Sequence, residues 1–230
     1  MIVALVDTLA EKLALEDRLK TNRAEVKSIE TTLRNLEQVA TAARKLMEEL
    51  DLCAPYLEAE AIANIRTQAA GVARELDVSR GRFATNRKEW LSIQKAGESL
   101  QRPAKDLAEH WQSYARRKLA PYLDLMLLVN YLPEVAASAG ELSQLVRQLE
   151  EHVKRPPRTQ AQLDQFQSRL GELGRRLDSV ARLPLGVQLF LKLVVEGKAT
   201  LADLTPEVQA WIAEGGRAAA FSISFSQRRS

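Results

Sequence analysis

The feature that most constrains this chain is a seven-residue repeat of apolar side chains between residues 26 and 50. Two series of positions carry the repeat: Val26, Leu33, Ala40 and Met47, and Ile29, Leu36, Ala43 and Leu50. Apolar positions spaced alternately by three and four residues form one stripe along an α-helix. The repeat therefore predicts a long helix that packs on another helix, as in a coiled coil. Upstream of Leu19 the spacing continues in another phase, which predicts a local change of supercoil.

A second segment, after Pro55, repeats the pattern over a similar length. Its two series are Ile62, Ala69, Leu76, Phe83, Trp90 and Gly97, and Ile65, Val72, Ser79, Asn86, Ile93 and Leu100. The series are least apolar at Ser79, Gly81 and Asn86, where a kink or a partner contact is expected. Two long helices of matched length with a short connection predict an antiparallel coiled-coil hairpin over residues 1–101. The alternative is that each helix packs on some other part of the chain.

The rest of the chain predicts a helical-bundle lobe over residues 102–183 and a small module over residues 184–230. In the lobe, a helix is expected to end or kink before Pro121, and the apolar run 122–132 to form a buried central helix. Thr159 with Gln162 fits a capping box, and Thr205 followed by Pro206 is typical of a helix start.

The last residues alternate between apolar and polar side chains. Phe221, Ile223 and Phe225 would share one face of a strand, with serines on the other. The predicted fold class is thus all-α: a long antiparallel coiled-coil hairpin, a helical-bundle lobe and a small C-terminal α+β cap with one strand or a short hairpin. A lone strand needs something to pair with, so we expect Phe221, Ile223, Phe225 and the nearby Trp211 to contact a protein partner, either a second copy of the strand or the sheet edge of another protein. The alternative is a short hairpin with residues near Lys198 to Leu201.

Few residues of this chain suit catalysis or metal binding. The single cysteine, Cys53, excludes an internal disulfide framework, and it has no histidine near it in the sequence. Asp106 and His110 are four residues apart, but no second pair complements them, so we expect an ordinary helix-surface pair. No glycine-rich phosphate loop is present. We therefore expect no catalytic residues, no cofactor, no metal and no enzymatic activity.

Several basic clusters keep a second function open. The net charge is only +3, and its excess lies in the C-terminal half. Phosphate binding requires several cations on one surface. The candidate nucleic-acid contacts are Arg82, Arg87, Arg116, Arg117, Arg155, Arg158, Arg228 and Arg229. The alternative to them is an ordinary solvated helix face.

The favoured function is a non-catalytic scaffold or adaptor subunit that acts in protein–protein assembly, as a homo-oligomer or within a larger complex. Arginine outnumbers lysine and alanine and leucine abound, which suggests a bacterial source. The architecture suggests an accessory subunit of a multiprotein system with an ATPase or a nuclease, for example in defence or chromosome handling. Nucleic-acid binding is the alternative function. We expect a cytoplasmic protein without a membrane segment, because no apolar run reaches the roughly 20 residues that a membrane helix needs.

Overall fold

The structure is a computed structural model, and it describes residues 2–83, 90–214, 217–218 and 221. Every regular element among these residues is a helix, which confirms the all-α class. The chain divides into two compact units, residues 1–107 and residues 108–230. The division falls within one helix, α4 (Gln101–Met126). The predicted boundaries after residues 101 and 183 stay predictions.

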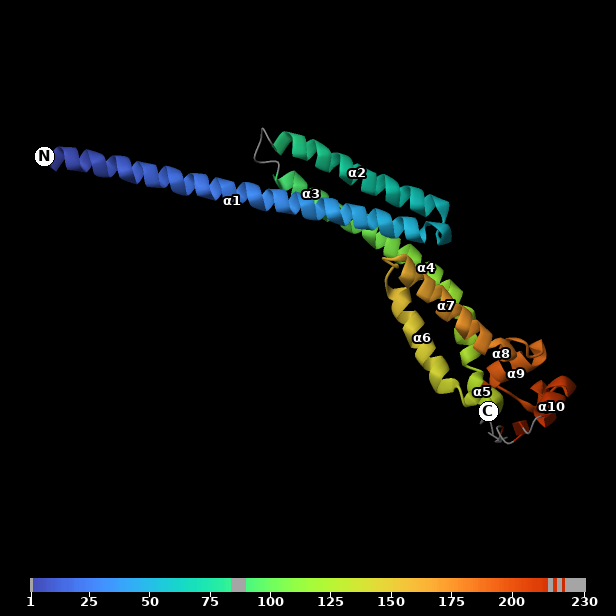
Figure 1. The fold of residues 1–230 in the computed structure, drawn as a ribbon. Helices are drawn as coiled ribbons and strands as arrows, with labels where there is room; N and C mark the ends of the chain where they lie inside the picture. Colours follow the sequence, from blue (N-terminus) through green and yellow to red (C-terminus); the bar gives the residue numbers. More distant parts are fainter. Residues whose placement is uncertain (1, 84–89, 215–216, 219–220, 222–230) are drawn as a thin grey trace, which may run out of the picture. The chain divides into compact units, whose positions relative to one another are not determined.

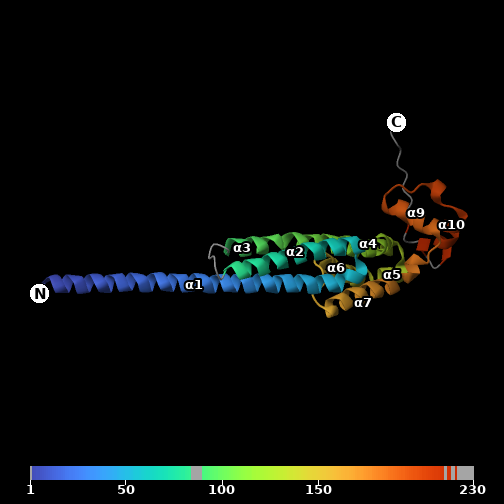
Figure 2. The same cartoon turned by 90° about the horizontal axis from the view of Figure 1, so that it is seen from above.

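The first unit is built from three helices that lie side by side where they overlap (Figure 1, Figure 2). These are α1 (Ile2–Cys53), α2 (Ala59–Phe83) and α3 (Trp90–Ser99), with a short 3-10 helix, η1 (Ala54–Tyr56), between α1 and α2. Pro55 lies in this turn, since proline lacks the N–H that a continuing helix would use. Both views show the N-terminal part of α1 extending beyond the ends of α2 and α3.

The prediction of a hairpin made of two helices of equal length is wrong in one respect. The expected second helix is instead two helices, α2 and α3, so that three segments pack together. The helical segment stops after Phe83, close to the region where the apolar repeat is least regular. A polar stretch gains little from packing, so a chain reversal costs least there.

The predicted stripe of α2 faces the core of the first unit. Ile65, Ala69, Val72 and Leu76 are all buried. The helices also approach closely at Gly97 of α3, where a Cβ atom would lie 2.9 Å from Cγ2 of Val39. A glycine is therefore what lets α3 pack this tightly against α1.

The face that α1 turns to its neighbours differs from the expected one. Most of the buried and half-buried positions belong to the Ile29 series and to a series three residues further on: Ile29, Thr32, Leu36, Val39, Ala43, Leu46, Leu50 and Cys53. Near the end of the helix, Met47, Glu49 and Leu52 are half-buried as well. The Val26 series lies to one side, with Val26 and Leu33 exposed. The buried face of α1 is therefore centred between the Ile29 series and the series that begins at Thr32.

The second unit begins in α4 and continues as a series of mostly short helices. After η3 (Val129–Tyr131) and α5 (Pro133–Ala136) come the longer α6 (Ala139–Lys154) and α7 (Gln160–Arg176). These are followed by α8 (Asp178–Ala181), α9 (Leu185–Val195), η4 (Leu201–Asp203) and α10 (Pro206–Ala213). The helix does not end before Pro121, since α4 continues through it to Met126. The run 122–132 is not one central buried helix, because it is divided between α4 and η3 and because Leu123 and Leu127 are exposed.

The core of the second unit forms around Trp111. This side chain is fully buried, and its Nε1 donates a hydrogen bond to the His152 carbonyl at 3.0 Å. Its ring meets Phe166 edge to face, with 5.4 Å between the ring centroids. Four residues of α6 are buried on one face (Leu142, Leu145, Leu149 and Val153), as their spacing predicts.

Both predicted helix starts are present. The Thr159 side chain accepts from the Gln162 N–H at 3.3 Å, and the Thr205 side chain accepts from the Val208 N–H at 3.4 Å. The return bond of the first cap differs from a capping box, because Oε1 of Gln162 accepts from the N–H of Arg158 rather than of Thr159. The predicted C-terminal strand lies outside the described residues, apart from Phe221.

Candidate interaction surfaces

The most prominent apolar surface of the first unit is a stripe on α1 formed by Leu19, Val26 and Leu33, which we call the α1 stripe. The three side chains are spaced by seven residues and are 56%, 55% and 54% exposed. They lie at successive heptad positions and therefore on nearly one line of the helix. Large aliphatic side chains gain free energy when they leave water, so a line of exposed ones is suited to docking.

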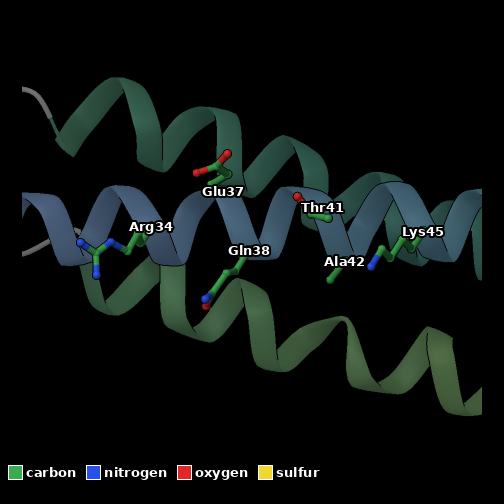
Figure 3. Close-up of a pocket in the computed structure, with 6 residues that line it drawn as sticks. All are labelled: Arg34, Glu37, Gln38, Thr41, Ala42 and Lys45. Carbon is green, nitrogen blue, oxygen red and sulfur yellow. The ribbon is translucent and has the colours of Figure 1, made fainter.

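A shallow polar hollow occupies another face of α1 (Figure 3). The side chains that line it come from α1 alone: Arg34, Glu37, Gln38, Thr41, Ala42 and Lys45. The hollow has one carboxylate among them. Within the described part of the chain, no group of three histidine, cysteine, aspartate or glutamate side chains is placed to hold a metal ion. The hollow is therefore an open polar face of a helix.

Two of the predicted partner contacts, Trp211 and Phe221, lie together in the second unit. The Phe221 ring packs on Trp211, Phe190 and Tyr131, with centroid distances of 6.1, 5.9 and 6.2 Å. Trp211 is buried, and the guanidinium of Arg217 lies over its ring at 5.0 Å. These rings thus contact one another within the unit. Their partner role stays a prediction, and Ile223 and Phe225 lie outside the described residues.

Of the eight predicted nucleic-acid contacts, the structure brings Arg155 and Arg158 together. Both line a cavity of about 270 Å³ at the connection between α6 and α7, together with Trp111, Glu151, His152, Pro156, Pro157, Gln162 and Phe166. Both arginines are exposed. The Nζ of Lys154 lies 2.5 Å from Oε1 of Glu151. This hydrogen bond, and then the positive charge of Lys154, lower the pKa of the Glu151 carboxyl.

His152 lies in the same cavity and is held by Arg169. The Nη1 of Arg169 lies 2.8 Å from Nε2 of His152. Burial, and then the charge of Arg169, lower the pKa of His152. The imidazole is therefore neutral at pH 7, and its Nε2 is suited to accept from the guanidinium.

Two of the other predicted cations, Arg116 and Arg117, do not line this cavity. Arg116 and Arg117 are exposed on α4, and as neighbours they point about 100° apart around the helix. Arg87, Arg228 and Arg229, and the side chain of Arg82, lie outside the described part of the structure.

Cys53 and Asp106 take part in the packing and hydrogen bonding of the fold. Cys53 is fully buried at the end of α1, and burial, followed by the charge of Glu49, raises its pKa to about 12. Its thiol is thus protonated at neutral pH, which disfavours a nucleophilic role. Asp106 accepts a hydrogen bond from Nε2 of Gln68 at 3.3 Å.

A second exposed apolar pair was not predicted from the sequence. Leu185 and Leu189 of α9 are 71% and 54% exposed. They are four residues apart and so share one face of the helix. The sequence does not reveal this exposed face, because α9 is apolar on several faces, a pattern that is typical of a fully buried helix.

The comparisons with known proteins add no relationship. Models of protein families, curated proteins and solved structures were all compared with this chain, and none of them matches it. The search for membrane spans, which covered the described residues, found no helix with the length and apolarity to cross a bilayer.

Proposed function

We propose that this chain is a non-catalytic scaffold or adaptor subunit that mediates protein–protein assembly, with the α1 stripe as its main docking surface. The observation that carries the proposal is the exposure of Leu19, Val26 and Leu33 along one line of α1. In this proposal the chain acts in the cytoplasm as an accessory subunit of a larger bacterial assembly, such as one built around an ATPase or a nuclease.

The length of α1 supports the proposal. Most of the stability of a helix in a protein comes from the packing of its apolar face, and isolated helices are marginal in water. The N-terminal part of α1 extends beyond α2 and α3 (Figure 2), and the side chains from residue 18 to residue 28 are all exposed, so apolar positions there gain little from these helices. A partner helix that forms a coiled coil with this part of α1 would supply the missing packing.

A test of this function replaces the stripe by acidic side chains. The stripe variant carries Leu19→Glu, Val26→Glu and Leu33→Glu, and the control variant carries Lys20→Glu, Lys27→Glu and Arg34→Glu. The control residues follow the stripe residues directly and are exposed, so the same side chain is introduced at the same level of the helix. Each tagged protein is purified from the cells that make it, and stoichiometric protein partners and the assembly mass are measured.

The proposal predicts that the wild type and the control variant assemble and that the stripe variant does not, because a buried carboxylate in an apolar seam is costly. Equal assembly of the stripe variant and the wild type would contradict the proposal.

Nucleic-acid binding is the second candidate, and one observation favours it. Arg155 and Arg158 lie at the same cavity, and two guanidinium groups at one site suit a phosphate. If this function holds, the wild type co-purifies with nucleic acid, and a variant with Arg155→Ala and Arg158→Ala loses it.

A further inference from the structure

We propose that α1 pairs with α1 of a second copy of this chain around Leu19, the first residue of the α1 stripe, with the two helices antiparallel. The inference rests on the proposed assembly role of the stripe, and it adds the identity and the direction of the partner. It depends on the charges beside Leu19 and Val26, in the part of α1 where all side chains from residue 18 to residue 28 are exposed.

Charged side chains flank the stripe in blocks of alternating sign. Leu19 and Val26 occupy equivalent heptad positions of type a, so the residue before each is at g and the residue four after it is at e. Arg18 and Arg23 flank Leu19, whereas Glu25 and Glu30 flank Val26. The block around Leu19 is basic on both sides, and the block around Val26 is acidic on both sides.

This pattern disfavours a parallel pair in register. In such a pair each g residue faces the e residue five positions further along the other helix. Arg18 would face Arg23 of the second copy, and Glu25 would face Glu30 of the second copy. Symmetry would double both contacts, so the interface would contain four pairs of like charges, which disfavour association.

An antiparallel pair places opposite charges together, because g then faces g and e faces e. With a twofold axis between Lys20 and Thr21, Arg18 faces Glu25 of the second copy, and Glu16 faces Arg23 of the second copy. The twofold axis repeats each contact, which gives four pairs of opposite charge. The arrangement is also closed, as symmetric dimers are, and exposes no further stripe for growth.

The register centres on Leu19 of the α1 stripe. Leu19 lies beside Asn22 of the second copy, and one polar residue in such a seam is a known means of fixing register.

The test is a charge exchange at Arg18 and Glu25, with the dimer dissociation constant measured by sedimentation equilibrium in low salt. The variant R18E places two carboxylates together in both symmetric contacts, and the variant E25R places two guanidinium groups together there. Each should weaken the dimer roughly tenfold, because exposed ion pairs contribute about 0.2–1 kcal/mol each. An equimolar mixture of R18E and E25R should restore pairing as a heterodimer. The control K27E changes a charge away from the seam and should leave the dissociation constant unchanged.

The opposite pattern would overturn the inference. In a parallel dimer R18E and E25R would each remove like-charge contacts and tighten the dimer. A wild-type chain that stays monomeric at about 100 µM would also overturn it. If that monomer still binds another protein through the α1 stripe, as judged by the stripe variant, the adaptor function stands and self-pairing falls.

Discussion

At the scale of single residues, burial decides which side chains keep their usual chemistry. Cys53 is the only thiol of the chain, and full burial with the nearby charge of Glu49 raises its pKa to about 12. At pH 8 almost none of this thiol is ionised, and the thiolate is the reactive form. The residue is thus placed for packing at the end of α1.

We expect Cys53 of the folded protein to react very slowly with a thiol reagent at pH 8, and to react at once after unfolding in guanidinium chloride. Burial favours the neutral thiol, so this contribution to folding stability is fully present below the thiol pKa of the unfolded chain. It is lost as the pH rises from about 9 to about 12. Rapid modification of the native protein at pH 8 would show that the turn after α1 is open.

Trp111 organises the second unit in the same way, through burial and one hydrogen bond. The Trp111→Ala variant should lose about 3–5 kcal/mol of unfolding free energy, since it removes a fully buried indole. Trp111→Phe should lose about 1–2 kcal/mol, because it leaves the His152 carbonyl without this donor. Leu127→Ala, at an exposed position of the same unit, is the control and should stay within about 0.5 kcal/mol. Urea unfolding followed by circular dichroism measures all three, and equal losses would refute the role given to Trp111.

At the scale of elements, periodicity predicted that stripes exist but not which neighbours they meet. The stripe of α2 is buried as predicted, since a helix between two others packs along both series. The α1 prediction was right about the helix and wrong about its buried face, because a repeat contains no information on the number of partner helices. The chain reversal after Phe83 was expected only as a kink.

Local capping chemistry was predictable, whereas the effect of Pro121 was not. Thr159 and Thr205 cap their helices because the signal is contained in adjacent residues. Pro121 removes one backbone donor, which predicted a helix end or a kink. Pro121 is exposed within α4, and the helix continues through it to Met126. The exposed face of α9 could not be predicted either, because which face of an apolar helix stays exposed depends on tertiary packing.

The two faces of α2 provide a matched test of the first unit. Leu76 is 7% exposed and Val78 is 51% exposed, and both lie in α2. Leu76→Asp should cost more than about 3 kcal/mol, because it buries a carboxylate without a partner. Val78→Asp should change the unfolding free energy by less than about 0.5 kcal/mol. Thermal melts followed by circular dichroism compare the two, and similar losses would contradict the assignment of the buried face.

At the scale of the whole molecule, the proposed function assigns stability and association to different surfaces of the first unit. The buried positions of α1, α2 and α3 form its core, whereas the α1 stripe lies outside that core. A chain of this kind can lose its assembly without losing its fold. The central claim is therefore that a partner covers the α1 stripe in the functional assembly.

Hydrogen–deuterium exchange of the backbone amides of residues 16–28 tests this claim most directly. It is measured on the assembly formed by the wild type and on the stripe variant, with residues 61–79 of α2 as the internal reference. We expect amides in residues 16–28 to exchange at least about 100-fold more slowly in the wild type than in the variant, because an uncovered helix opens readily. The reference amides of residues 61–79 should exchange at the same rate in the wild type and in the stripe variant. Equally fast exchange of residues 16–28 in both proteins would show that nothing covers the stripe, and would contradict the central claim.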